Sequence, residues 1–153
     1  MLNDLYNKQI LAFAAEIPRV GRLTSPNGSA KAHSRLCGST VTVDVVFEDG
    51  VVTDFGQEVK ACALGQASSS ILARHVIGAT RDELADVRDR MTAMIKEDGP
   101  ADFDGQWADL NVLEPVREFK SRHASTLLTF NAVVDAVDAA LENQGNVPAA
   151  ANA

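Results

Sequence analysis

The chain has 153 residues, of which 46% are hydrophobic and 23% charged, a composition typical of a globular protein with one domain. Its net charge of −7 at pH 7 argues against binding to nucleic acid or to an anionic membrane through a basic surface. No apolar run approaches the length of about 18 residues that a membrane-spanning helix needs. We therefore expect neither nucleic acid nor membranes among its partners.

The chain has two cysteines, Cys37 and Cys62. Its first residues do not have the basic stretch followed by an apolar core that marks a signal peptide, so we expect a cytoplasmic protein. Thiols in the cytoplasm stay reduced. The two cysteines are thus expected to be metal ligands, reactive thiols or buried residues rather than a disulfide.

The N-terminal segment predicts one helix and then irregular structure. Apolar residues recur at helical spacing over residues 2–17, and Pro18 ends the pattern. Residues 18–30 contain prolines and glycines that interrupt regular structure, and residues 30–36 form a short candidate strand.

Residues 39–48 predict a strand that is buried on one face. Apolar residues alternate there with polar residues such as Asp44, which are predicted to face away from the core. Asp49-Gly50 is a turn pair that favours a hairpin, so residues 51–59 should pair back on the first strand. The core-facing positions are Val41, Val43, Val45 and Phe47.

Two helices follow the hairpin. The first is predicted to begin after Cys62 and to run to about residue 77, where Gly78 is a suitable C-terminal stop. Thr80 and Glu83 have the spacing of a capping box, which predicts the start of the second helix.

The last third of the chain predicts a connection, short turns and a long helix. Residues 98–106 form an acidic connection, and Trp107 is predicted to anchor short helical turns that Pro115 breaks. A final helix is expected over residues 121–142, followed by a disordered tail of small and polar residues at 143–153. The inward positions of the helix are Leu127, Leu128, Val133, Val134, Val137 and Leu141.

These elements together predict an α+β fold. A small antiparallel sheet is built on the hairpin of residues 39–59, with an extra strand near 30–36, and packs against four to five helices. The elements form one domain over residues 1–142.

Cys62 lies where the predicted strand gives way to the predicted helix. A thiol at a helix start lies near unpaired N–H groups and the positive end of the helix dipole, which favour the reactive thiolate. Small residues follow Cys62 and leave its sulfur open to a partner. Because Cys37 precedes the hairpin and Cys62 follows it, antiparallel pairing should bring both cysteines to one end of the sheet. The alternative is that Cys62 is a buried structural cysteine.

The order of these features resembles the U-type iron–sulfur cluster assembly scaffolds, the family of IscU, SufU and the NifU N-terminal domain. The resemblance covers about residues 2–142 and includes the SufU-like insertion before the last helix. Its motifs are Pro18-Arg19-Val20-Gly21, Cys37-Gly38-Ser39, Cys62-Ala63-Leu64-Gly65-Gln66-Ala67-Ser68-Ser69-Ser70, Gly78-Ala79-Thr80-Arg81-Asp82-Glu83-Leu84, and Val116-Arg117-Glu118-Phe119 with Arg122.

Two of the four ligand positions of that family differ here. Ser39 replaces the aspartate after Cys-Gly, and gapless alignment from Phe119 puts Ser125 in the place of the third cysteine. His123 is the candidate substitute, because imidazole is a good ligand for iron or zinc. A half-buried structural histidine is the alternative reading of His123. The other two histidines, His33 and His75, have weaker claims; His75 is predicted in the middle of a helix.

The resemblance implies a scaffold or sulfur-accepting protein that works with a cysteine desulfurase in iron–sulfur cluster assembly, not an enzyme. Cys62, with Cys37, would accept sulfur, and Cys37, Cys62 and His123 would bind iron or a transient iron–sulfur cluster, with zinc a candidate metal in the isolated protein. The chain would be a monomer or a weak dimer.

A different class of function also fits the sequence. The chain could be a U-type fold that has lost cluster assembly and acts as a regulatory or interaction module, with zinc or without metal. A hydrolase is the third option, but no histidine is placed near Ser68, Ser69 or Ser70 by a recognisable motif.

Overall fold

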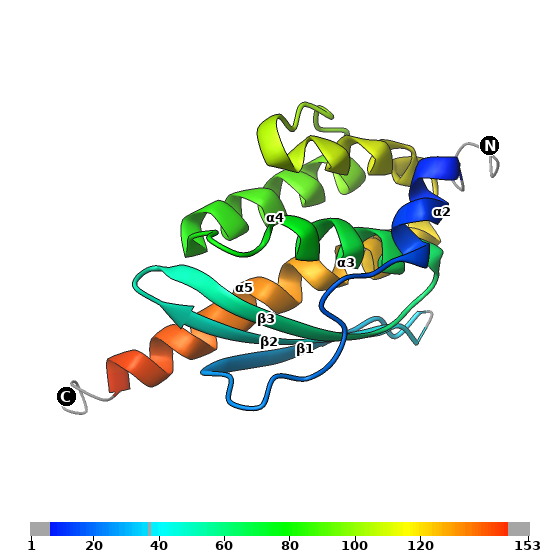
Figure 1. Ribbon diagram of the computed structural model, residues 1–153. Helices are drawn as coiled ribbons and strands as arrows, with labels where there is room; N and C mark the ends of the chain where they lie inside the picture. Colours follow the sequence, from blue (N-terminus) through cyan, green and yellow to red (C-terminus); the bar gives the residue numbers. More distant parts are fainter. Residues whose placement is uncertain (1–6, 37, 147–153) are drawn as a thin grey trace.

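The computed structural model describes residues 7–36 and 38–146 of the chain. A three-stranded antiparallel sheet in the order β1-β2-β3 forms one layer, and helices cover one of its faces (Figure 1). The predicted α+β class is confirmed. The elements in chain order are α2 (Lys8–Ala15), β1 (Gly28–His33), β2 (Thr40–Glu48), β3 (Val51–Lys60), α3 (Ala63–His75), α4 (Arg81–Lys96), the 3-10 helices η1 (Gly105–Glu118) and η2 (Lys120–Arg122), and α5 (His123–Asn146).

The hairpin forms as the alternating pattern predicts. β2 and β3 pair antiparallel from Thr40 opposite Lys60 to Glu48 opposite Val51. Asp49 and Gly50 make the turn with φ angles of 55° and 81°, the left-handed conformations that a two-residue hairpin turn requires. β1 adds to the other edge of β2, which confirms the extra strand.

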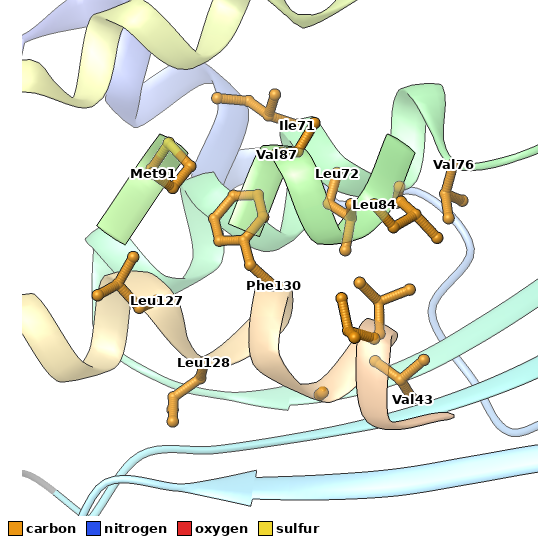
Figure 2. Packing of buried hydrophobic residues seen from close by; sticks show 14 of the residues in the cluster. Val43, Ile71, Leu72, Val76, Leu84, Val87, Met91, Leu127, Leu128 and Phe130 are labelled. Atoms are coloured by element: carbon orange, nitrogen blue, oxygen red, sulfur yellow. The ribbon is translucent and has the colours of Figure 1, made fainter. Parts of the chain in front are cut away.

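The core lies between the sheet and the helices. The four predicted apolar positions of β2 are at most 2% exposed, and α5 packs across β1 and β2 beneath α3 and α4. Figure 2 shows Phe130 projecting from α5 toward Met91 of α4 and Leu72 of α3. All three side chains belong to one continuous hydrophobic cluster, so the helices are fixed relative to the sheet.

Helix ends follow local chemistry. The side chain of Thr80 accepts a hydrogen bond of 3.1 Å from the Glu83 N–H at the start of α4, as the capping box predicts. The Glu83 carboxylate also accepts from the Trp107 indole N–H at 2.8 Å, which ties η1 to α4. Gly78 has a φ of 89° in the turn that follows α3, so it stops this helix as expected.

Three details of the prediction are corrected. Pro115 does not break the segment after Trp107, because η1 continues through it to Glu118 with 3-10 geometry. Leu141 of α5 is 40% exposed rather than buried. α5 also continues to Asn146, because Asn143 and Gln144 donate side-chain hydrogen bonds to the backbone carbonyls of Asn27 and Phe47.

Asp44 of β2 is the fourth correction. It is fully buried although it lies on the polar face of the strand. Arg22 donates to its two carboxylate oxygens at 2.7 and 3.0 Å, and the Leu23 N–H and Ser29 hydroxyl donate to it as well. The loop before β1 therefore crosses the outer face of the sheet and covers Asp44. The Arg22 guanidinium lowers the pKa of Asp44, against the opposing effect of burial.

Candidate functional site

The hairpin brings the predicted site segments to one end of the sheet. Thr40 begins β2 opposite Lys60, the last residue of β3, so Gly38-Ser39 and Ala61-Cys62 flank the same paired end. The predicted approach of Cys37 to Cys62 falls on a residue outside the described part of the chain. The approach of the two cysteines stays a prediction. The segment Gly38-Ser39, which follows in the sequence, lies at the same end of the sheet as Cys62.

Cys62 is the N-cap residue of α3, with φ −68° and ψ 173°. Its backbone carbonyl accepts the first helical hydrogen bond, from the Gln66 N–H at 2.9 Å, while its thiol makes no capping bond. The side chain is half-buried. The helix thus begins at Cys62 without using the sulfur, which leaves the sulfur available to other partners.

The sulfur of Cys62 lies 3.4 Å from the hydroxyl oxygen of Ser125 in the first turn of α5. Ser125 is buried, and its hydroxyl lies 3.2 Å from the Arg122 carbonyl, to which it donates. A neutral thiol can then donate to the Ser125 oxygen, and a thiolate can accept the hydroxyl proton instead. The residue that the alignment puts in the place of the third cysteine is therefore in contact with Cys62.

Gly65 makes this contact geometrically possible. A Cβ atom at this position would lie 2.7 Å from the Ala61 Cβ and 3.1 Å from the Ser125 carbonyl oxygen. Both distances are shorter than ordinary van der Waals contact, so only glycine lets the first turn of α3 approach the first turn of α5 this closely. The small-residue run after Cys62 signalled a close approach, but not which segment would make it.

His123 begins α5 and is half-buried. Its Nε2 lies 3.0 Å from the Arg117 carbonyl oxygen, so the neutral ring donates from Nε2 and keeps its lone pair on Nδ1. A metal-binding histidine often donates its other N–H to a carbonyl in this way. In the part of the chain that the structure describes, no three His, Cys, Asp or Glu side chains are grouped to hold a metal ion. The ligand set of Cys37, Cys62 and His123 includes a residue outside that part, and it stays a prediction.

His33 and His75 lie in different surroundings. His33 is exposed at the end of β1, opposite Thr40 and thus at the same end of the sheet as Cys62. His75 is the last residue of α3, not a mid-helix residue, and its ring packs edge-on against Trp107 with centroids 5.6 Å apart. Its Nε2 lies 3.6 Å from the Asp109 carboxylate.

A pocket of about 360 Å³ lies at the start of α5, lined by Lys96, Lys120, His123 and Ala124. No pattern in the sequence predicts this pocket. The two lysines are far apart in the sequence, and neither belongs to a motif. They meet because α4 ends beside the start of η2.

One segment, Lys120–Gln144, is long and apolar enough by composition to cross a membrane, with a mean hydropathy of 1.3 over its most apolar window. This segment comprises η2 and most of α5. The protein itself buries 67% of that window, which is the environment of a core helix.

Comparisons with known proteins place the whole arrangement in one family. The model of the NifU-like N-terminal domain matches residues 5–125. A solved NifU-like protein (N-terminal) from Brucella abortus is 58% identical, with 92% of this chain and 97% of that chain covered and a TM-score of 0.89. A putative SUF-system scaffold from Fervidobacterium islandicum shares the fold at 20% identity, with 87% of this chain and 96% of that chain covered and a TM-score of 0.78.

Curated relatives agree with this placement. The iron–sulfur cluster assembly scaffold protein IscU of Thermotoga maritima is 23% identical over 87% of this chain and 92% of its own length. The IscU scaffold protein of Streptococcus pyogenes is 25% identical over 89% of this chain and 84% of its own length. The chain belongs to the family of the NifU-like N-terminal domain.

Proposed function

We propose that this chain is an iron–sulfur cluster assembly scaffold that accepts sulfur on Cys62 and carries iron or an iron–sulfur cluster as its cargo. The observation that carries the proposal is the position of the Cys62 sulfur, which caps no backbone group and lies 3.4 Å from Ser125 at the convergence of β3, α3 and α5. The names of the Thermotoga maritima and Streptococcus pyogenes relatives support it.

Sulfur would arrive as the outer atom of a persulfide on a donor protein. The thiolate of Cys62 attacks that atom, a new S–S bond forms on Cys62, and the S–S bond of the donor breaks. The donor cysteine leaves as a thiolate, so no external oxidant or reductant is needed. Ser125 would assist by donating a hydrogen bond from its hydroxyl to the Cys62 thiolate, which stabilises the thiolate before the attack.

Cargo iron would be bound by Cys37, Cys62 and His123 through Nδ1 of the imidazole. Thiolate and imidazole ligands suit both iron and zinc, and three protein ligands leave one position open for sulfide or a substrate thiol. An open site holds its metal less tightly than a closed site with four ligands, which suits transient binding. Zinc would occupy the same ligands in the isolated protein.

The partner that supplies sulfur would be a cysteine desulfurase of the cytoplasm, and the chain would work as a monomer or weak dimer. The test is to incubate the chain with a purified cysteine desulfurase and cysteine, and to measure the bound sulfane sulfur by mass spectrometry. We expect one sulfur atom on native protein and on Cys37→Ser, and none on Cys62→Ser. Equal loading of Cys62→Ser and native protein would contradict the proposal.

The metal site has its own test. His123→Ala should weaken zinc or iron binding by about tenfold or more, as loss of one ligand does, without a change in fold. His75→Ala is the matched control, because His75 packs against Trp107 at the other end of α3. Unchanged metal affinity in His123→Ala would remove His123 from the ligand set.

A second candidate function is a regulatory or interaction module that has lost cluster assembly. The observation that favours it is that an alcohol, Ser125, contacts Cys62 where the family resemblance puts a thiol. This candidate predicts that the desulfurase loads no sulfur onto the native chain and that protein purified without oxygen contains no iron.

A further inference from the structure

The pocket at the start of α5 carries positive charge that the proposed function leaves unused. Lys96 ends α4, Lys120 begins η2, and both side chains are exposed where they line the pocket. Among the ion pairs of the described residues, none involves either lysine. Two ammonium groups without a carboxylate partner therefore share one pocket.

The pocket places two lysines side by side on a chain with a net charge of −7. Six arginines of the described part of the chain form ion pairs with carboxylates. The paired arginines are Arg19, Arg22, Arg81, Arg88, Arg90 and Arg117. The pocket lysines have no such partner, so their positive potential can attract an anion from outside.

The pocket adjoins the thiol site. Ala124 lines it, and the next residue, Ser125, has its hydroxyl oxygen 3.4 Å from the Cys62 sulfur. A partner that binds in the pocket is therefore positioned one residue along α5 from the group that contacts the sulfur-accepting thiol. In the proposed function, a protein that delivers sulfur to Cys62 docks around the start of α5, where the pocket lies.

The shape of the pocket favours a side chain over an enclosed small molecule. Its volume of about 360 Å³ is at the lower end of the range of small-molecule pockets, and its walls include two long, flexible lysines. A carboxylate that projects from a protein surface can reach both ammonium groups. Charges at the rim of an interface mainly raise the rate of association and fix the orientation of the partner.

We propose that Lys96 and Lys120 bind an acidic segment, carrying aspartate or glutamate side chains, of the protein that donates sulfur to Cys62. The inference rests on the proposed function for the identity of that partner. The binding of an acidic segment can be measured without any sulfur chemistry.

The direct test titrates the full chain with a hexaglutamate peptide and follows the backbone amide signals of Lys96, Lys120 and Ala124 by NMR. We expect these signals to shift, and Lys96→Glu/Lys120→Glu to bind the peptide about tenfold more weakly than native protein.

Lys31→Glu is the control, because Lys31 is an exposed lysine on β1 outside the pocket. Equal peptide affinity in the pocket variant and the control would overturn the proposal. So would saturation of the same signals by inorganic phosphate at lower concentration than by the peptide, which would assign the pocket to a small free anion.

A second measurement separates this proposal from the proposed function. In sulfur loading by a cysteine desulfurase, Lys96→Glu/Lys120→Glu should raise the half-saturating concentration of the chain about tenfold and leave the rate at saturation unchanged. An unchanged half-saturating concentration would overturn the docking site while loading still depends on Cys62. Loading that persists in Cys62→Ser would overturn the proposed function, and the peptide titration would then decide on the pocket alone.

Discussion

Gly65 controls the site at the scale of a single residue. The missing Cβ lets Ser125 of α5 reach Cys62, although the two residues lie far apart in the sequence. The contact depends on how closely α3 and α5 approach, because the sulfur and the hydroxyl are short groups on rigid helix starts. A change of one methyl group at Gly65 therefore acts on the reactive thiol without touching it.

We predict that Gly65→Ala lowers the free energy of unfolding by about 1–2 kcal/mol. Overpacking against Ala61 and Ser125 costs about 1–3 kcal/mol, and the better helix propensity of alanine offsets part of that cost. The variant should also react more slowly with iodoacetamide at Cys62 in a Cys37→Ser background, because Ser125 is pushed away from the thiolate that its hydrogen bond stabilises. Urea unfolding and the alkylation rate measure the two effects.

The control for this prediction is the double variant Ala61→Gly/Gly65→Ala. It removes the Ala61 Cβ that would lie 2.7 Å from the new methyl group, so part of the lost stability should return. If Gly65→Ala alone leaves both the stability and the alkylation rate unchanged, the close packing of α3 on α5 does not set the Cys62 environment.

At the scale of elements, the Arg22–Asp44 ion pair fastens the loop before β1 to the outer face of the sheet. Because Arg22 holds the pKa of Asp44 below its ordinary value, the ion pair stabilises the fold fully above the unfolded-state pKa of about 3.9. That contribution is lost as the pH falls through the lower, folded-state pKa.

Asp44→Asn should therefore lower the free energy of unfolding at pH 7 by about 2 kcal/mol, the usual effect of losing charged hydrogen bonds. The variant should lose less stability than native protein as the pH falls from 5 to 2, through the unfolded-state pKa of about 3.9 and toward the lower folded-state pKa. Asp135→Asn is the control, since Asp135 is exposed on α5 and makes no ion pair within the described residues. Urea unfolding across this pH range gives the comparison, and parallel pH profiles for native protein and Asp44→Asn would rule out the ion pair as the cause.

The elements also show what sequence could and could not predict. The alternating apolar residues of β2, the Asp49-Gly50 turn and the Thr80 cap depend on neighbours in sequence, and all were predicted correctly. The burial of Asp44 depends on Arg22, a residue 22 positions away in an irregular loop, and no local pattern reports such a partner. The sequence also could not predict that η1 continues through Pro115. A proline that fits one turn of a 3-10 helix gives the same local signal as a proline that ends a helix.

The candidate site divides in the same way. The start of α3 at Cys62 was visible as the end of a strand pattern followed by small residues, and Ser125 was identified by family resemblance. The lysine pocket was not predicted, because Lys96 and Lys120 meet only through the packing of α4 against α5. Long-range packing decides such contacts, and a single sequence does not encode them in any short motif.

At the scale of the whole molecule, α3 connects the candidate site to the rest of the core. Cys62 lies at one end of this helix, and His75 at the other end packs against Trp107, the single tryptophan of the chain. Nine residues of α3 are buried between these ends, from Leu64 to Ala73. The two ends are about 20 Å apart at the rise of an α-helix. A continuous core over this distance implies that both ends unfold together.

We therefore predict a single cooperative unfolding transition in urea. In the Cys37→Ser background, the fraction of Cys62 open to rapid alkylation and the fluorescence of Trp107 should change with the same midpoint, because one hydrophobic cluster joins the sheet to α3, α4, η1 and α5. Far-ultraviolet circular dichroism supplies a third probe of the same transition. If Cys62 becomes reactive at clearly lower urea than the tryptophan transition, the end of the sheet that carries Cys62 opens as a separate unit. The close contact of α3 with Ser125 would then be the weakest part of the fold rather than part of its core.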